Sequence, residues 1–343
     1  MGKTKRINLA LQGGGAHGAF TWGVLQRILE DERLEVAGIS GTSAGALNGA
    51  AIKSGLCEGG RDKALENLDW LWREIGAVSD TRMPSWMSPF GVEGISKAME
   101  MSPVFQFGEA WSRTVSPYAY GPFYENPLRR IVKRFNFDMI CAHSGPAFFV
   151  NATRVRDGKL RVFNASEVCE DVILASACLP TMFQAVELFD EKTGRIEAFW
   201  DGGYTGNPAL FPLFADALPE DIVVININPL ERDEVPISPQ QIQNRLNEIS
   251  FNASLMKELR AINFVQRLLR EGVMEQGRMS EVFVHMISDD ELMTKLNVAT
   301  KIIANPIVLG ELRAAGYEAA HRFLDQSYAD LGERSSVSLE DMF

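Results

Sequence analysis

Apolar residues recur at two spacings along the chain, and the order of these spacings predicts the fold. Short continuous apolar runs are typical of buried strands, and they occur over residues 6–12, 34–40, 147–155, 160–163, 196–201, 221–228 and 281–288. Apolar residues at helical spacing predict helices over residues 19–30, 44–52, 61–75, 166–177, 238–270 and 306–329. Because strands alternate with helices, we expect an α/β protein with three layers (α/β/α) around a mainly parallel central sheet.

Residues 77–125 interrupt this alternation. Methionine and aromatic residues gather there, and prolines separate them, so the segment cannot form one regular element. We interpret it as a helical or irregular insertion. Its apolar side chains either fill a core or line a lid or acyl-chain groove, and both roles can hold together.

Nothing in the chain requires a second domain. There is no internal repeat, low-complexity linker or break in composition. We therefore expect residues 1–330 to form a single domain that contains the insertion at 77–125. Residues 331–343 lack periodicity and are predicted to be a flexible tail.

Composition limits the possible partners. The chain has 343 residues, of which 46% are hydrophobic, and a formal net charge of -11. This charge excludes nucleic acid as a general partner, because phosphate neutralisation needs a basic face, and it also repels an anionic membrane on average. The cysteines show neither CxxC spacing nor histidine neighbours at zinc-ligand spacing, so we predict reduced thiols in a cytoplasmic protein, without a metal site or a disulfide framework.

Any membrane contact should be peripheral, at a membrane or lipid surface, because no run approaches the ~20 apolar residues that span a bilayer. A helix predicted to begin at Asn126 and Pro127 carries four basic residues, Arg129, Arg130, Lys133 and Arg134. Such a cluster most often marks a solvated helix face. Contact with lipid phosphates is the less favoured alternative.

Three short stretches carry candidate chemistry, and the first is Gly13-Gly14-Gly15-Ala16-His17-Gly18, between the first predicted strand and the first helix. Its glycines match the GxGxxG fingerprint of dinucleotide-binding proteins. That fingerprint expects an acidic residue about 20 positions later, where this chain has Ser40-Gly41-Thr42-Ser43. We therefore favour an oxyanion hole built from the amides of Gly13, Gly14 and Gly15.

The second stretch is Gly41-Thr42-Ser43-Ala44-Gly45, at a predicted junction of strand and helix. Such a sharp turn lifts the serine oxygen out of the backbone at a helix N-terminus, and Gly41 and Gly45 leave room for the turn. Ser43 is thus a candidate nucleophile. The third stretch is Asp201-Gly202-Gly203, at the end of a predicted strand, which is weak evidence alone because Asp-Gly turns are common.

Together the three stretches supply a nucleophile, a base and an oxyanion site, the minimal set for acyl transfer. In this combination the sequence resembles the patatin-like phospholipase family, whose GGGxxG, GxSxG and DG[GA] motifs these stretches match. Ala175-Ser176-Ala177-Cys178-Leu179-Pro180 is similar to the ASxxxP segment of that family. The resemblance covers about residues 6–212, and the C-terminal third carries no assigned motif.

The resemblance implies a patatin-like fold and a serine acyl hydrolase that cleaves carboxylic esters of lipids, of the phospholipase A or lysophospholipase type. In the implied Ser–Asp dyad, Ser43 attacks the ester carbonyl, Asp201 takes its proton, and Gly13, Gly14 and Gly15 bind the oxyanion. Gly41, Gly45, Gly202 and Gly203 support the two turns. Neither a cofactor nor a metal is implied, and the oligomeric state stays open.

Several alternatives remain at this stage. An ordinary Ser-His-Asp esterase or lipase would need a histidine after its acid, and His285 and His321 follow Asp201 in the chain. We favour core or surface positions for both. A storage-polyester depolymerase, a dinucleotide-binding oxidoreductase using Gly13–Gly18, and a binding module with a vestigial site also stay in view. The loop has His17 where the family often has Arg or Lys, which weakens the case for a fixed cation beside the oxyanion site.

Overall fold

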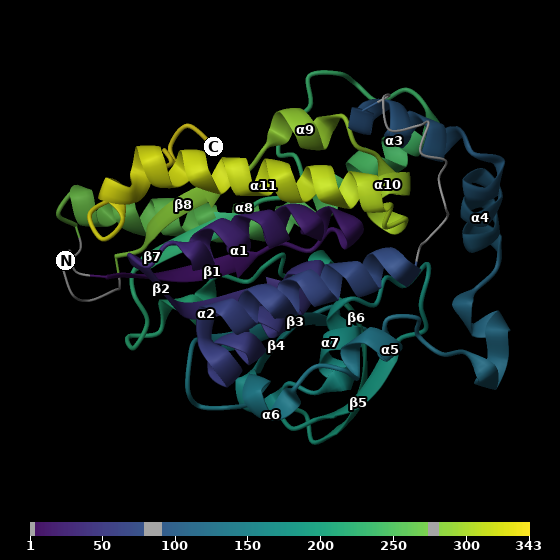
Figure 1. Cartoon of the computed structure of the whole chain (residues 1–343), viewed down its shortest axis with the longest axis horizontal. Coiled ribbons are helices and arrows are strands. Elements are labelled where there is room, and N and C mark those ends of the chain that lie inside the picture. The colour runs from purple at the N-terminus through teal and green to yellow at the C-terminus, as the bar shows by residue number, and fades with distance from the viewer. Residues whose placement is uncertain (1–3, 79–90, 274–280) are drawn as a thin grey trace.

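A computed structural model describes residues 4–78, 91–273 and 281–343. Its centre is an eight-stranded sheet (Figure 1). Seven of the strands follow the order β5-β6-β3-β2-β1-β7-β8, and the eighth, β4, also pairs with β3. The parallel strands are β1 (Lys5–Leu11), β2 (Leu34–Thr42), β3 (Ala147–Arg154), β7 (Asp221–Ile225) and β8 (Phe283–Ile287). The antiparallel strands are β4 (Leu160–Asn164), β5 (Val186–Asp190) and β6 (Arg195–Asp201). The predicted α/β class with a mainly parallel sheet is confirmed, and β5 is a strand that the pattern did not predict.

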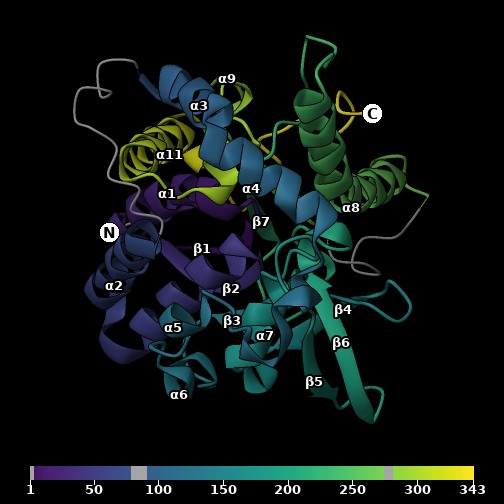
Figure 2. The ribbon, with the colours of Figure 1, turned by 90° about the vertical axis from the view of Figure 1, so that its right-hand side faces the viewer.

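Helices cover both faces of the sheet. Figure 2 shows α1 (Gly18–Glu30), α2 (Ala44–Val78) and α11 (Pro306–Ser327) on one side of the strands and α8 (Pro239–Arg270) on the other. Because neighbouring side chains of a strand point to opposite faces, β1 contributes to two cores. Leu9 and Leu11 lie in the larger core beneath α1 and α2, whereas Ala10 lies in the smaller core with α8.

Some helices have bounds that differ from the predicted ones. The two helices expected at 44–52 and 61–75 are continuous in α2 except for a kink at Gly59 and Gly60. The helix expected from Asn126 contributes only α5 (Arg129–Val132), and the one expected at 166–177 is the shorter α7 (Glu170–Ser176). Three further short helices are α6 (Phe137–Ile140), α9 (Asp290–Thr294) and α10 (Val298–Ile302).

The insertion forms α3 (Gly91–Met101), α4 (Pro103–Thr114) and the 3-10 segment η3 (Pro117–Phe123), while residues 79–90 lie outside the described part. In Figure 1, α4 stands apart from the body at the end of the molecule where the parallel strands finish. Ile95 and Met99 of α3 are buried in the larger core, whereas Phe107 and Trp111 of α4 are exposed. The insertion thus fills a core with one helix and exposes aromatic rings on the next.

Residues 331–343, for which the pattern predicts a flexible tail, lie against β8. The backbone N–H of Ser336 donates to the Val284 carbonyl at 3.2 Å, and the Ser335 hydroxyl accepts from the Val284 N–H at 3.0 Å. Leu339 is buried in the smaller core. An aperiodic segment carries no pattern from which such contacts could be foreseen.

No helix in the three described ranges is both long enough and apolar enough to cross a bilayer.

Candidate active site

The predicted site residues meet at the carboxyl edge of the sheet. Gly13, Gly14 and Gly15 follow β1, and Ser43 follows β2, its parallel neighbour, so the two turns lie side by side. Asp201 ends β6 and pairs with Ala152 of β3, the next strand beyond β2. Residues far apart in the chain are thus brought to one place by the order of the strands.

Ser43 sits on a strained turn between β2 and α2. Its φ of 54° makes it the one non-glycine residue with positive φ in the described ranges. Its backbone N–H donates to the Ser176 hydroxyl at 2.9 Å, and that hydroxyl donates to the Asn151 carbonyl at 2.7 Å. This geometry is that of a nucleophile elbow, which places the hydroxyl at the positive end of α2.

Small residues are required around the elbow because main chains meet there. A Cβ on Gly45 would lie 2.1 Å from the Leu11 carbonyl oxygen, and one on Gly41 would lie 2.6 Å from the Gly45 carbonyl oxygen. Next to the acid, a Cβ on Gly202 would lie 2.2 Å from the Asn151 carbonyl oxygen. Any side chain at these three positions would force the strands and turns apart.

Asp201 is buried, with 1% of its surface exposed. One carboxylate oxygen, Oδ1, accepts from the Gly203 N–H at 2.7 Å, while Oδ2 has no hydrogen-bond partner among the described residues. Burial raises the pKa of Asp201 to about 7, against a smaller lowering by the Gly203 N–H and the Ser43 hydroxyl. The Ser43 hydroxyl is therefore near the carboxylate, although it makes no hydrogen bond to Oδ2, and catalytic hydrogen bonds often tighten only when substrate binds.

The glycine loop packs directly on the elbow. A Cβ on Gly13 would lie 2.7 Å from the Ser43 Cβ, so only glycine allows this approach. The Gly13 N–H, however, donates to Asn207 Oδ1 at 2.6 Å and is already occupied. The prediction that Gly13 donates to an oxyanion is corrected on this point. Within the described part of the chain, the N–H groups of Gly14 and Gly15 have no acceptor.

Four buried amides, none predicted from the sequence, hold this loop in place: Gln12, Asn207, Asn228 and Asn252. Asn228 Nδ2 donates to the Gly13 carbonyl at 2.8 Å and to Gln12 Oε1 at 3.1 Å. Gln12 Nε2 donates to Asn252 Oδ1 at 3.2 Å. Polar residues within the apolar run at 221–228 were a signal for this network, because a buried amide needs partners.

His17 is 1% exposed, and its Nε2 lies 2.9 Å from the Thr300 hydroxyl. That hydroxyl donates to the Asn297 carbonyl, so Nε2 carries the proton and Nδ1 is left without a partner. Burial, followed by the charges of Lys301 and Arg232, holds the pKa of His17 well below its usual range. His17 is therefore neutral and fastens the glycine loop to α10.

Neither histidine of the triad alternative lies at the site. His285 Nε2 is 2.9 Å from Oδ1 of Asp221, the first residue of β7, so it lies at the amino edge of the sheet. Ser43 lies at the opposite, carboxyl edge, because β2, β1 and β7 are parallel. His321 is exposed on α11 and lies 3.7 Å from Asp325.

Three residues of the predicted basic helix face carboxylates. Arg129 binds Glu170 and Asp171, Arg134 binds Glu74 at 3.1 Å, and Lys133 lies 4.0 Å from Glu125. These pairs favour the solvated face over contact with lipid phosphates. The described ranges also contain no group of three or more acidic, histidine or cysteine side chains that could hold a metal ion.

Comparison with known proteins identifies the family of the chain. The family model for patatin-like phospholipases matches residues 9–214, which is more than half of the 343-residue chain. A search of curated proteins found no match.

Solved structures similar to the chain include VipD and ExoU. VipD from Legionella pneumophila has 14% identity and a TM-score of 0.42, with 94% of this chain and 67% of VipD covered. ExoU from Pseudomonas aeruginosa, crystallised with SpcU, has 15% identity and a TM-score of 0.31, with 93% of this chain and 53% of ExoU covered. On the family match, this chain belongs to the patatin-like phospholipase family and is a hydrolase.

Proposed function

We propose that this protein is a serine acyl hydrolase that cleaves carboxylic esters of lipids through a Ser43–Asp201 dyad. One observation carries the proposal: a strained serine at a helix N-terminus lies beside a buried carboxylate, one oxygen of which has no hydrogen-bond partner among the described residues. The elbow holds the nucleophile at the positive end of α2, and burial makes the carboxylate a stronger base than an ordinary aspartate.

The reaction then needs four events. The Ser43 hydroxyl attacks the ester carbonyl carbon while Oδ2 of Asp201 takes the hydroxyl proton. The N–H groups of Gly14 and Gly15 stabilise the negative oxygen of the tetrahedral intermediate. The intermediate collapses, the ester C–O bond breaks, and Asp201 returns the proton to the departing alcohol. Water, deprotonated by Asp201, finally attacks the acyl-enzyme and releases the fatty acid and free Ser43.

This role fixes the direction of the pH dependence. Asp201 acts as a base only when it is ionised, and its pKa is about 7. The rate of ester hydrolysis should therefore rise as the pH increases through about 7 and stay low in mild acid.

The chemistry suits several ester classes. Phospholipase A and lysophospholipase activity follow most directly from the family, and a storage polyester presents the same carboxylic ester. Profiling the products released from a mixed lipid extract by mass spectrometry, with Ser43→Ala as the blank, separates these substrates.

The test of the dyad is hydrolysis of short p-nitrophenyl esters together with labelling by a fluorophosphonate. Ser43→Ala should abolish both, and Asp201→Asn should lower kcat by ~10³-fold or more, because the base is lost. Ser166→Ala and Asp216→Asn, which change exposed residues, serve as matched controls and should behave like the wild type. Activity retained in both Ser43→Ala and Asp201→Asn would refute the dyad.

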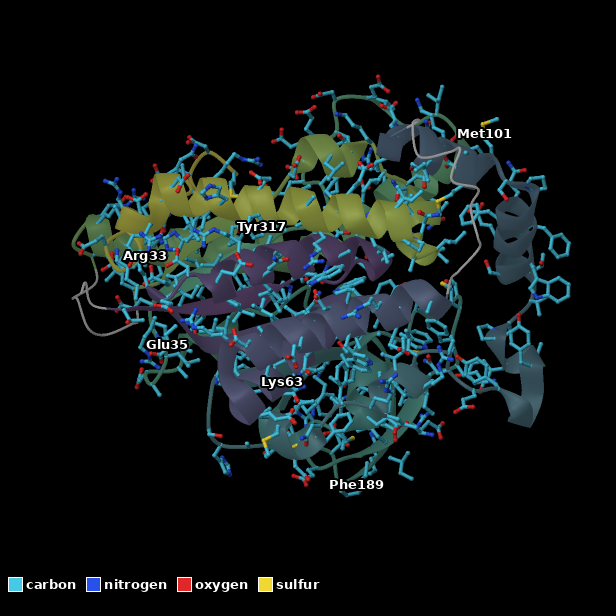
Figure 3. The ribbon with its side chains drawn as sticks, viewed as in Figure 1. Arg33, Glu35, Lys63, Met101, Phe189 and Tyr317 are labelled. Atoms are coloured by element: carbon cyan, nitrogen blue, oxygen red, sulfur yellow. The ribbon has the colours of Figure 1, made fainter. Side chains whose placement is uncertain are left out.

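We further propose that the protein meets lipid at an aromatic patch, defined as Met101, Phe107, Trp111, Tyr118 and Tyr120. All five are exposed, from 46% for Trp111 to 74% for Met101. Met101 projects where α3 ends, and side chains of α4 extend away from the body beside it (Figure 3). The Trp111 Nε1–H donates to the Tyr120 hydroxyl at 3.2 Å, which joins α4 to η3.

The low charge of this region and its contact with the segment near Asp201 favour a neutral or zwitterionic lipid surface as the binding partner of the patch. Between residues 101 and 124 the sequence has two charged residues, Glu109 and Arg113, although 23% of the whole chain is charged. Aromatic residues with so little charge suit a membrane interface. The Tyr118 hydroxyl accepts from the Ala185 N–H at 3.1 Å. Ala185 lies close in sequence to Cys178, and the Cys178 carbonyl accepts from the Asp201 N–H at 2.8 Å. The patch therefore borders the segment that positions the acid.

Co-sedimentation with phosphatidylcholine vesicles tests the patch. Phe107→Ala combined with Trp111→Ala should weaken binding by ~10-fold or more, because two large apolar side chains no longer leave water. Hydrolysis of a soluble ester should stay unchanged. Phe189→Ala, an exposed aromatic on β5 far from α4 (Figure 3), is the control. Equal binding of the double variant and the wild type would exclude the patch.

A further inference from the structure

The C-terminal third of the chain supports the glycine loop through α10. Thr300 binds His17, as described above, and Lys301 packs its main chain against Gly15. A Cβ on Gly15, whose φ is +59°, would lie 2.3 Å from the Lys301 carbonyl oxygen. Two consecutive residues of α10 therefore contact the loop that carries the free N–H groups.

The Lys301 side chain continues this support. Its Nζ donates to Asn228 Oδ1 at 3.2 Å, and Asn228 Nδ2 donates to the Gly13 carbonyl at 2.8 Å. A single amide thus links the ammonium group to the backbone of the glycine loop. Because Asn228 presents its oxygen to Lys301 and its nitrogen to Gly13, the charge also fixes which way round this amide lies.

Among the residues that the structure describes, the Lys301 ammonium group has no direct counter-ion. Within the described ranges no carboxylate forms an ion pair with Lys301. The charge of Glu248 on α8 raises the pKa of Lys301. Both carboxylate oxygens of Glu248, however, accept from Arg232, at 2.8 and 2.7 Å. An ammonium group can donate three hydrogen bonds, and within the described ranges Nζ of Lys301 donates to Asn228 Oδ1, so it favours further negative charge in its surroundings.

The other groups around Lys301 leave it as the titrating cation of this cluster. Burial lowers the pKa of Lys301 to about 8, with Glu248 raising it and Arg232 lowering it. His17 of η1 (Gly15–His17) is neutral, and Asn228 does not ionise. Glu248 keeps a lowered pKa despite its burial, because Arg232, Lys301 and Arg245 stabilise its charge.

We propose that Lys301 is a positioning residue for ester hydrolysis: through Asn228 and its packing on Gly15, it keeps the Gly14 and Gly15 N–H groups directed at the oxyanion and adds positive charge behind them. This inference rests on the proposed function of Ser43 and Asp201. The cation at the glycine loop is then Lys301, which lies in the C-terminal third where no motif was assigned, and not the residue at position 17.

The proposal predicts a bell-shaped pH profile for kcat. The rate rises through about pH 7 as Asp201 ionises, and it falls above about pH 8 as Lys301 loses its proton. Once neutral, Lys301 no longer attracts the charge that develops on the oxyanion.

The experiment compares Lys301→Met and Lys301→Arg in the full-length protein, with p-nitrophenyl ester hydrolysis and the rate of fluorophosphonate labelling as measurements. Lys301→Met removes the charge at similar length and should lower kcat ~10- to 100-fold, with KM within about twofold, and slow labelling to the same degree. Lys301→Arg should keep at least about a third of the wild-type kcat and lose the fall above pH 8, because Arg does not titrate there. Lys295→Met, at the C-cap of α9 and half exposed, is the matched control and should match the wild type.

A purely structural role for Lys301 would change stability but leave the pH profile as it was. The inference is therefore overturned if the fall above pH 8 persists in Lys301→Arg, or if Lys301→Met keeps wild-type kcat. Should Lys301→Met not fold, as judged by circular dichroism, the profile of Lys301→Arg decides. Failure of the proposed function looks different, because the wild type itself would then show no Ser43-dependent hydrolysis.

Discussion

Asp201 and Asp221 are both buried, at opposite edges of one sheet, with 1% and 5% of their surfaces exposed. Asp221 accepts hydrogen bonds on Oδ1 from His285 Nε2 at 2.9 Å and from the Gly332 N–H at 2.8 Å. Asp201 accepts a single one, from Gly203, and its Oδ2 has none in the described part of the structure. The contacts of Asp221 are structural, whereas Asp201 has one oxygen without a partner among the described residues, as the proposed base requires.

The same comparison explains why residue types alone do not identify a triad. His285 lies between Asp221 and the Ser336 hydroxyl, which is 3.1 Å from Nδ1, so a serine, a histidine and an aspartate are joined here as well. This group connects the C-terminal segment to β7 and β8. It lies at the edge of the sheet away from the elbow, and its histidine is buried.

The largest effect on stability should follow from removing the unsatisfied charge. Asp201 has a pKa of about 7 against an ordinary value of 3.8. The folded state therefore binds this proton more tightly than the unfolded state, and the free energy of unfolding falls as the pH rises from 3.8 through about 7. An asparagine side chain cannot ionise, so Asp201→Asn should be more stable than the wild type at pH 8, by up to about 4 kcal/mol.

Urea unfolding at pH 5 and pH 8 measures this difference. The gain in the free energy of unfolding of Asp201→Asn over the wild type should be larger at pH 8 than at pH 5. Asp216→Asn, which changes an exposed residue, should show no gain at either pH. An Asp201→Asn variant that is no more stable than the wild type at pH 8 would mean that the charge is well solvated.

A smaller effect of opposite sign is expected at the satisfied aspartate. His285→Ala leaves a cavity and a buried Asp221 carboxylate without its main partner, so the free energy of unfolding should drop by about 2–3 kcal/mol. The kcat of the folded enzyme should not change. His321→Ala, at an exposed site, should alter stability by less than about 0.5 kcal/mol. Loss of hydrolysis in folded His285→Ala would instead restore the triad alternative.

Local pattern sufficed where the chain itself carries the constraint. Each stretch around Gly13, Ser43 and Asp201 is a turn at the end of a strand, and the residues that such a turn needs are neighbours in sequence. The strand and helix order followed for the same reason, since periodicity is local. The packing of residues 331–343 could not be predicted from the pattern, because it depends on a few contacts with β8 and α8.

The occupied Gly13 amide and the loop cation could not be predicted in this way. Asn207 is separated from Gly13 by 194 positions, and Lys301 from Asn228 by 73. No spacing rule relates these residues, because sheet order and the packing of α10 bring them together. An amide looks equally suitable for a surface or a core until its partners are known.

Local sequence was enough to predict the α/β class, the family and the candidate nucleophile and acid, because those depend on short motifs and on local periodicity. The tertiary structure was needed to show, within the described residues, which glycine N–H groups have no acceptor, that Oδ2 of Asp201 has no partner, and that Lys301 packs on the glycine loop whereas His17 is neutral. Those properties depend on burial and on contacts between distant segments, which arise only when the strands assemble.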